Sequence, residues 1–223
     1  MSGLLLRVAL DGAGVALSPL PVAAAIALLG TRAPLASSFG FVLGWLSHLT
    51  VLSTIVLLVL NGPQVGSSKP FDRAVSVILL GLGVLLLALA LRSWLKRAAW
   101  EDELAPWMQR LARITPRLAF IAGFLGVSLN PKNLALALSG MHSINAAQLG
   151  AQESIVALIA FILIGTVSVA APVAVYVTLP ARSEGILEGC QAWLSDHARA
   201  SVLWVLVAVG TVLTVSAALA SRS

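Results

Sequence analysis

The stretch 14-GVALSPLPVAAAIALLG-30 decides how this chain folds, and a near-copy, 126-GVSLNPKNLALALSG-140, lies in the second half of the sequence. Each run is mostly apolar but contains a polar residue followed by a proline, Ser18–Pro19 in the first and Asn130–Pro131 in the second. Proline lacks the main-chain donor that a helix needs and clashes with the preceding turn. Ser or Asn before proline is also typical of a helix start. Each stretch therefore predicts a helix that breaks and begins again.

The residues around these stretches are those of a membrane protein. Of the 223 residues, 59% are hydrophobic and only 10% are charged, whereas a soluble domain carries about 25% charged residues. A transmembrane helix needs about 20 mostly apolar residues. Six windows meet this need, at 4–30, 36–60, 74–91, 117–140, 154–180 and 200–220. We therefore expect an all-α polytopic membrane protein with six transmembrane helices, of which the first and fourth are broken by proline.

The similarity of the two stretches indicates an internal repeat. A fainter match pairs "GWLS" at Gly44 with "GTVS" at Gly165, each in the middle helix of its half. The sequence predicts three-helix repeats at 1–93 and 117–223, joined by a linker at 94–116. Because three is odd, the second repeat enters from the opposite side of the membrane. Inverted repeats with interrupted helices are typical of secondary transporters.

The basic residues predict the orientation. Nine Lys or Arg residues lie in the segments on the side of the linker, and four lie on the side of the termini. Cytoplasmic loops carry the excess of positive charge, so we expect the linker in the cytoplasm and both termini outside a bacterial inner membrane. Within the linker, Trp107, Leu111 and Ile114 could form the apolar face of an amphipathic helix on the inner leaflet. A solvated linker is the alternative.

Several classes of function are disfavoured by the same residues. The net charge of +5 comes from loops that flank apolar runs, which is a topology signal and not a nucleic-acid site. The single cysteine, Cys190, leaves no disulfide within the chain and no CxxC motif. The three histidines lie on different segments without carboxylates at a ligand spacing, so we expect no metal site. No cofactor loop or catalytic constellation is visible, so we expect a protein that uses no cofactor and is not an enzyme.

The candidate binding site lies at the two breaks. A half-helix that begins near the middle of the bilayer presents N–H groups and the positive end of its dipole. Two such ends brought together by an inverted repeat would bind an anionic or strongly polar group, and Lys132 adds a full positive charge. The alternative is that both prolines make purely structural kinks. The predicted substrate-binding residues are Ser18, Pro19, Pro21, Asn130, Pro131, Lys132 and Asn133.

Two further ionisable residues lie within the predicted spans. Asp11 precedes the first break, and an intramembrane carboxylate is a functional candidate because its burial is costly. It could couple protons or ions to transport, or it could form a local ion pair with Arg7. His48 could relay protons, or it could be a neutral side chain bonded to a neighbouring hydroxyl. Gly40 and Gly44 form a GxxxG pattern that predicts close helix packing, and the same is expected of Gly81 and Gly83.

These features resemble a known family. The six-helix layout and "GFLGVSLNPKNLALAL", with its Asn-Pro-Lys element at 130–132, are similar to the LysE superfamily of exporters. The "LSPLP" start, the Trp-containing linker and "SLNPKN" most resemble the GAP/Sap proteins, the actinobacterial peptidoglycolipid- and sulfolipid-addressing proteins. The resemblance implies a membrane protein that helps to move cell-envelope glycolipids outward. One difference is that Leu20 stands in the first half where Lys132 stands in the second, so two equivalent ion sites are not expected.

The sequence thus favours a transporter, or a transport accessory, for envelope glycolipids or their anionic or polar precursors. An exporter of amino acids or other small metabolites is the first alternative. A membrane scaffold that recruits a lipid synthesis or export machine is the second. The expected partners are the substrate and membrane lipids, with a larger lipid exporter or a second copy of the chain as candidates.

Overall fold

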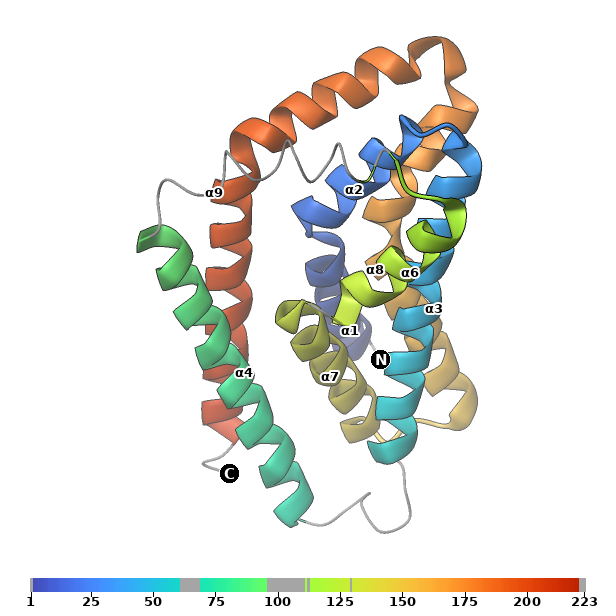
Figure 1. Ribbon diagram of the computed structural model, residues 1–223. Coiled ribbons are helices and arrows are strands. Elements are labelled where there is room, and N and C mark those ends of the chain that lie inside the picture. The colour runs from blue at the N-terminus through green and yellow to red at the C-terminus, as the bar shows by residue number, and fades with distance from the viewer. Residues whose placement is uncertain (1, 61–68, 96–110, 112, 129, 221–223) are drawn as a thin grey trace.

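A computed structural model describes residues 2–60, 69–95, 111, 113–128 and 130–220 (Figure 1). These residues form helices and short connections, with no strand among them, which confirms the all-α prediction. Most of the linker predicted at 94–116 lies outside the described residues, and so does Trp107 of its proposed amphipathic helix, whereas Leu111 and Ile114 are half-buried and pack against the core. The helices are α1 (Ser2–Ala16), α2 (Pro19–Leu29), α3 (Pro34–Leu60), α4 (Lys69–Leu95), α6 (Pro116–Ser128), α7 (Pro131–Ala146), α8 (Ala151–Thr178) and α9 (Pro180–Ala220).

The two proline breaks lie where the sequence predicts them. The chain bends by 54° between α1 and α2 and by 65° between α6 and α7, and new helices begin at Pro19 and Pro131. Among the described residues, three helical segments are long and apolar enough to cross a bilayer, and counting each bent pair as one span raises the number to five. The sixth predicted window overlaps an apolar helical segment, Val202–Val215, that is shorter than a typical span.

The segment between the last two predicted spans is helical, although the sequence suggests a loop there. It forms the first part of α9, a helix of 41 residues. Leu187 and Leu194 are buried against α2, whereas Glu184 and Glu188 are exposed. Such an amphipathic helix is hidden from a search for continuous apolar runs. In Figure 1 this part of α9 (orange) crosses over the helices below it, and the later part (red) descends beside α4.

The largest helix–helix contacts join the two halves of the chain. α3 packs against α6, α1 against α8, and α4 against the later part of α9. The last pair stands to one side of the other helices, as Figure 1 shows. In each pair one helix comes from the first half and the other from the second. The two halves therefore form one core and not two separate bundles.

Close packing by glycine is confirmed at three of four predicted positions. A β-carbon at Gly40 or Gly44 would press on the main chain of α6, and one at Gly83 would meet Thr214 on α9. The prediction is wrong for Gly81, which is exposed and has nothing within 4 Å of a β-carbon. Gly81 and Gly83 face different directions because each step along a helix turns about 100°, so two steps turn about 200°.

One buried side chain links the middle helices of the two halves. Trp45 on α3 is fully buried, and its indole Nε1 donates to the carbonyl of Gly165 on α8 at 3.1 Å. Buried indole N–H groups need a partner because an unpaired donor in an apolar interior is costly. The bond connects two segments, "GWLS" and "GTVS", that the sequence pairs as repeat-related.

We expect Trp45→Phe to lower the free energy of unfolding by about 1–3 kcal/mol, because it leaves the Gly165 carbonyl without this donor and reduces the packed volume. Thermal unfolding in detergent measures the change. Trp204→Phe is the matched control, since Trp204 is 74% exposed, and we expect it to stay within about 0.5 kcal/mol of the wild type. Equal effects of the two substitutions would contradict the assigned role of Trp45.

Candidate functional site

The first break deprives two carbonyls of their helical donors. In a continuous helix the carbonyls of Val15 and Leu17 would accept from the residues four positions on, which are Pro19 and Pro21. Carbonyls without a donor are costly in the apolar interior of a membrane. The hydroxyl of Ser18 donates to the Val15 carbonyl at 2.8 Å and so replaces one missing donor. The Leu17 carbonyl needs a partner from elsewhere.

That partner is Lys132, from the second break. Its Nζ donates to the carbonyl of Leu17 at 3.1 Å, to the carbonyl of Gly14 at 2.5 Å and to the hydroxyl of Ser18 at 2.8 Å. The Gly14 carbonyl is available because the Ser18 N–H bonds instead to Ala16. These three bonds match the three donors of an ammonium group. Lys132 is only 3% exposed, and its charge lies at the negative end of the α1 dipole.

The second break is capped locally. Asn130 Oδ1 accepts from the N–H of Lys132 at 3.1 Å, and the Asn130 carbonyl accepts from Asn133 and Leu134. Together with Pro131, which has no N–H, these bonds occupy the first turn of α7. The N–H groups that the sequence expected to be free are therefore bonded within the chain. The positive group at the junction is Lys132 Nζ, and the two breaks meet through it.

The second buried polar residue at the start of α7 is Asn133. Its side chain is fully buried, and neither atom of its amide has a hydrogen-bond partner in the described part of the chain. Buried amides are almost always hydrogen-bonded. Its role as a substrate contact stays a prediction, and the unpartnered amide makes Asn133 a candidate contact for a polar group from outside the chain.

Asp11 and His48 lie at different helix interfaces. Asp11 faces α7, where Ser139 donates to its Oδ2 at 3.3 Å and Gly140 packs close to its side chain. His48 faces α6, where its ring meets the edge of Phe124 with centroids 4.6 Å apart. The structure thus brings Asp11 to the helix that carries Lys132, but places the two side chains with separate partners. Ser139 is a neighbour of Asp11 that the sequence gave no reason to select.

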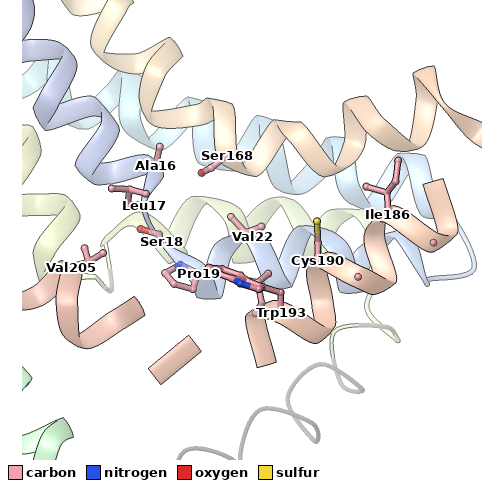
Figure 2. A pocket seen from close by; sticks show the side chains of 13 residues that line it. Ala16, Leu17, Ser18, Pro19, Val22, Ser168, Ile186, Cys190, Trp193 and Val205 are labelled. Carbon is pink, nitrogen blue, oxygen red and sulfur yellow. The ribbon is translucent and has the colours of Figure 1, made fainter. Parts of the chain in front are cut away.

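An apolar cavity of about 590 Å³ lies against the first break (Figure 2). It is open to the surface, and most of its wall is hydrocarbon. One side is the bend between α1 and α2, and the other is the first part of α9, with Ser168 of α8 between them (Figure 2). The lining residues are Ala16, Leu17, Ser18, Pro19, Val22, Ser168, Gly185, Ile186, Gly189, Cys190, Trp193, Leu194 and Val205.

The cavity was not foreseen, apart from Ser18 and Pro19. Most of its α9 wall comes from the segment between the last two predicted spans, and only Val205 of that wall lies within the sixth predicted window. Ser168 is one hydroxyl among many in the apolar runs. Among the described residues, no group of three or more His, Cys, Asp or Glu side chains could hold a metal ion. The junction therefore offers one buried cation, two hydroxyls and a hydrocarbon wall.

A protein-family model matches most of the sequence. The model describes the "Sap, sulfolipid-1-addressing protein" family, and residues 8–218 match it. The chain belongs to this family. The match confirms the resemblance to the GAP/Sap proteins, and it spans both breaks and the whole cavity wall of this sulfolipid-1-addressing family member. Comparisons with curated proteins and with solved structures gave no match.

Proposed function

We propose that this chain is a membrane transporter, or a transport accessory, that moves cell-envelope glycolipids or their anionic precursors outward across the bacterial inner membrane. The observation that carries the proposal is the buried contact of Lys132 with Ser18 and the end of α1. It joins the two breaks beside an apolar cavity. Broken helices that meet near the middle of a bilayer are typical of substrate sites in secondary transporters. Family membership supports a lipid as the substrate.

In this proposal the chain has six spans arranged as two inverted three-helix repeats, with α1–α2, α3 and α4 in one and α6–α7, α8 and α9 in the other. The contacts of α3 with α6 and of α1 with α8 support it, because the repeat exchanges these two pairs. Segment Val202–Val215 would cross the membrane with help from flanking residues. The termini would lie outside and the linker in the cytoplasm, as the basic residues favour.

The roles of the site residues follow from their contacts. Ser18 lines the cavity and would meet the acidic or polar part of the substrate, with the buried charge of Lys132 behind it and the unpartnered amide of Asn133 as a further contact. Pro19, Pro21, Asn130 and Pro131 would shape the two breaks. Asp11, half-buried against Ser139, would couple a proton or ion to the movement. His48 would relay protons at the interface between α3 and α6.

The cavity favours a lipid over a small metabolite. An amino acid carries two charged groups and would need a polar, enclosed pocket, whereas this cavity is open and mostly hydrocarbon. The relation of this chain to the LysE exporters therefore concerns architecture in this proposal, and the transported molecule differs. A scaffold that acts through the linker would not need the cavity, and it would need Lys132 only for the stability of the fold.

The test compares glycolipids at the cell surface with those in whole cells. In bacteria that lack this chain, we expect a glycolipid to leave the surface and accumulate inside, and the wild-type gene to restore it. Lys132→Ala and Asn130→Ala should fail to restore it even when expression is raised until their folded membrane abundance equals that of the wild type, whereas Arg113→Ala, at an exposed position, should restore it fully. An unchanged surface in cells without the chain would refute the proposal.

A further inference from the structure

The buried hydroxyls of Ser37, Ser38, Ser53 and Ser168 have no hydrogen-bond partner among the described residues, and of these four only Ser168 lines the cavity. Three helical threonines, Thr166, Thr178 and Thr214, donate to the carbonyl four residues earlier, at 2.7–2.8 Å. This is the ordinary way for a hydroxyl in an apolar helix to find a partner. The Ser168 hydroxyl is also buried, but it has no hydrogen-bond partner in the described part of the chain. Instead it stands in the wall of the cavity (Figure 2).

The other hydroxyl of the wall is already engaged. Ser18 donates its proton to the Val15 carbonyl and accepts from Lys132. Ser168 is therefore the hydroxyl in this wall whose proton no described residue accepts. A ligand that fits must bring an acceptor for Ser168 and otherwise be hydrocarbon, because the rest of the wall is apolar.

The helix on the other side of the cavity is suited to the surface of a bilayer. The first part of α9 exposes Glu184 and Glu188, whereas Leu187 is buried on α2. Amphipathic helices of this kind lie at the boundary between head groups and acyl chains. Gly185 and Gly189 line the cavity, and a β-carbon at either would meet nothing within 4 Å. The cavity thus has room on the α9 side for a hydrocarbon chain.

We infer that this cavity binds one acyl chain of an esterified lipid, with the ester carbonyl accepting from Ser168 and the chain lying between the α1–α2 bend and α9. The inference rests on the proposed function, because it names the part of the substrate that the cavity holds. The head group then lies on the side of Ser18 and Lys132. No covalent step is involved.

The single cysteine provides the measurement. Cys190 lines the cavity and is exposed, so a maleimide should modify it in the full-length protein held in amphipol. We expect palmitoyl lysophosphatidylglycerol, at about ten times its dissociation constant, to slow modification roughly tenfold, since the reagent reaches the thiol only when the cavity is empty. Glycerophosphoglycerol, which has the same head group and no chain, should not protect Cys190. The inference is overturned if glycerophosphoglycerol protects Cys190, or if the lysolipid does not protect it.

Two variants test where the acyl chain and the ester of the lipid bind. Gly185→Trp fills the cavity and should abolish protection, whereas Gly81→Trp, at an exposed position outside the cavity, should leave it intact. The hexadecyl ether analogue lacks the carbonyl, so the wild type should bind it about fivefold more weakly than the ester, as expected for one hydrogen bond. Ser168→Ala should remove that difference while keeping the protein folded. Unchanged protection in Gly185→Trp, or an ester preference that survives in Ser168→Ala, overturns the assignment.

The binding measurement and the export measurement can fail separately. If Gly185→Trp abolishes protection of Cys190 but cells that lack this protein keep their surface glycolipids, the acyl site is supported and the export role is refuted. Normal export dependence with no protection of Cys190 by any lysolipid would refute the acyl site alone.

Discussion

Replacing Lys132 by Met should destabilise the protein by about 2–4 kcal/mol. The substitution leaves the carbonyls of Gly14 and Leu17 without the donor that they have now. Each unpaired buried carbonyl costs about 1–3 kcal/mol. Burying an ammonium is itself costly, and the relief of that cost offsets part of the loss. We expect the carbonyls to dominate, because the ammonium has three hydrogen bonds and lies at the negative end of a helix.

The prolines supply a specific rescue of this variant. Pro21→Ala restores an N–H four residues after Leu17, and this N–H reaches the Leu17 carbonyl once Ser18 moves from its extended conformation (φ −127°, ψ 95°) toward a helical one. The double variant Lys132→Met/Pro21→Ala should therefore recover about 1–2 kcal/mol of the loss. Pro70→Ala, in the first turn of α4, is the control for removing a proline from a helix start, and it should not rescue.

Equilibrium unfolding in mixed micelles measures both effects. Arg113→Met removes a cation from an exposed position and should change stability by less than about 0.5 kcal/mol. If Lys132→Met is as stable as the wild type, or if Pro70→Ala rescues it as well as Pro21→Ala does, then Lys132 does not serve as the missing donor of the first break.

The sequence was sufficient to locate both breaks but not the partner of Lys132. Proline removes a donor wherever it stands, so helix starts at Pro19 and Pro131 follow from local chemistry. The acceptors of Lys132 are mainly main-chain carbonyls, of Gly14 in the last turn of α1 and of Leu17 just after it, and no residue type marks a carbonyl that lacks a donor. Counting the donors lost to Pro19 and Pro21 indicates that two acceptors need partners, but it does not identify the donor.

The cavity illustrates a different limit. Hydropathy finds segments that cross the membrane, because every residue of such a segment contributes to the average. The first part of α9 mixes Glu184 and Glu188 with Leu187 and Leu194, so its average is low although one face is apolar. Gly185 and Gly189 contribute to the cavity because open space lies beside them. That space depends on where α9 packs relative to the bend between α1 and α2.

The contact of α3 with α6 gives the second large expected effect. A β-carbon on Gly44 would overlap the carbonyl oxygen of Phe120 and come within 2.9 Å of the amide nitrogen of Phe124. From the other side, a β-carbon on Gly123 would overlap the carbonyl oxygen of Phe41. In both cases the obstacle is main chain, which cannot rotate away as a side chain can. The two helices would have to separate along their contact.

We therefore expect Gly44→Ala to lower stability by about 3 kcal/mol, at the upper end of the usual cost of overpacking, and to reduce the folded fraction in membranes. Gly81→Ala is the matched control, because nothing lies within 4 Å of its β-carbon. There the better helix propensity of alanine should stabilise α4 by up to about 1 kcal/mol. Unfolding of the two variants under the same conditions separates packing from propensity, since the same chemical change should give effects of opposite sign. A Gly44→Ala protein as stable as the wild type would mean that α3 and α6 do not approach this closely. The α3–α6 contact would then be too loose to brace the second break, which lies at the end of α6.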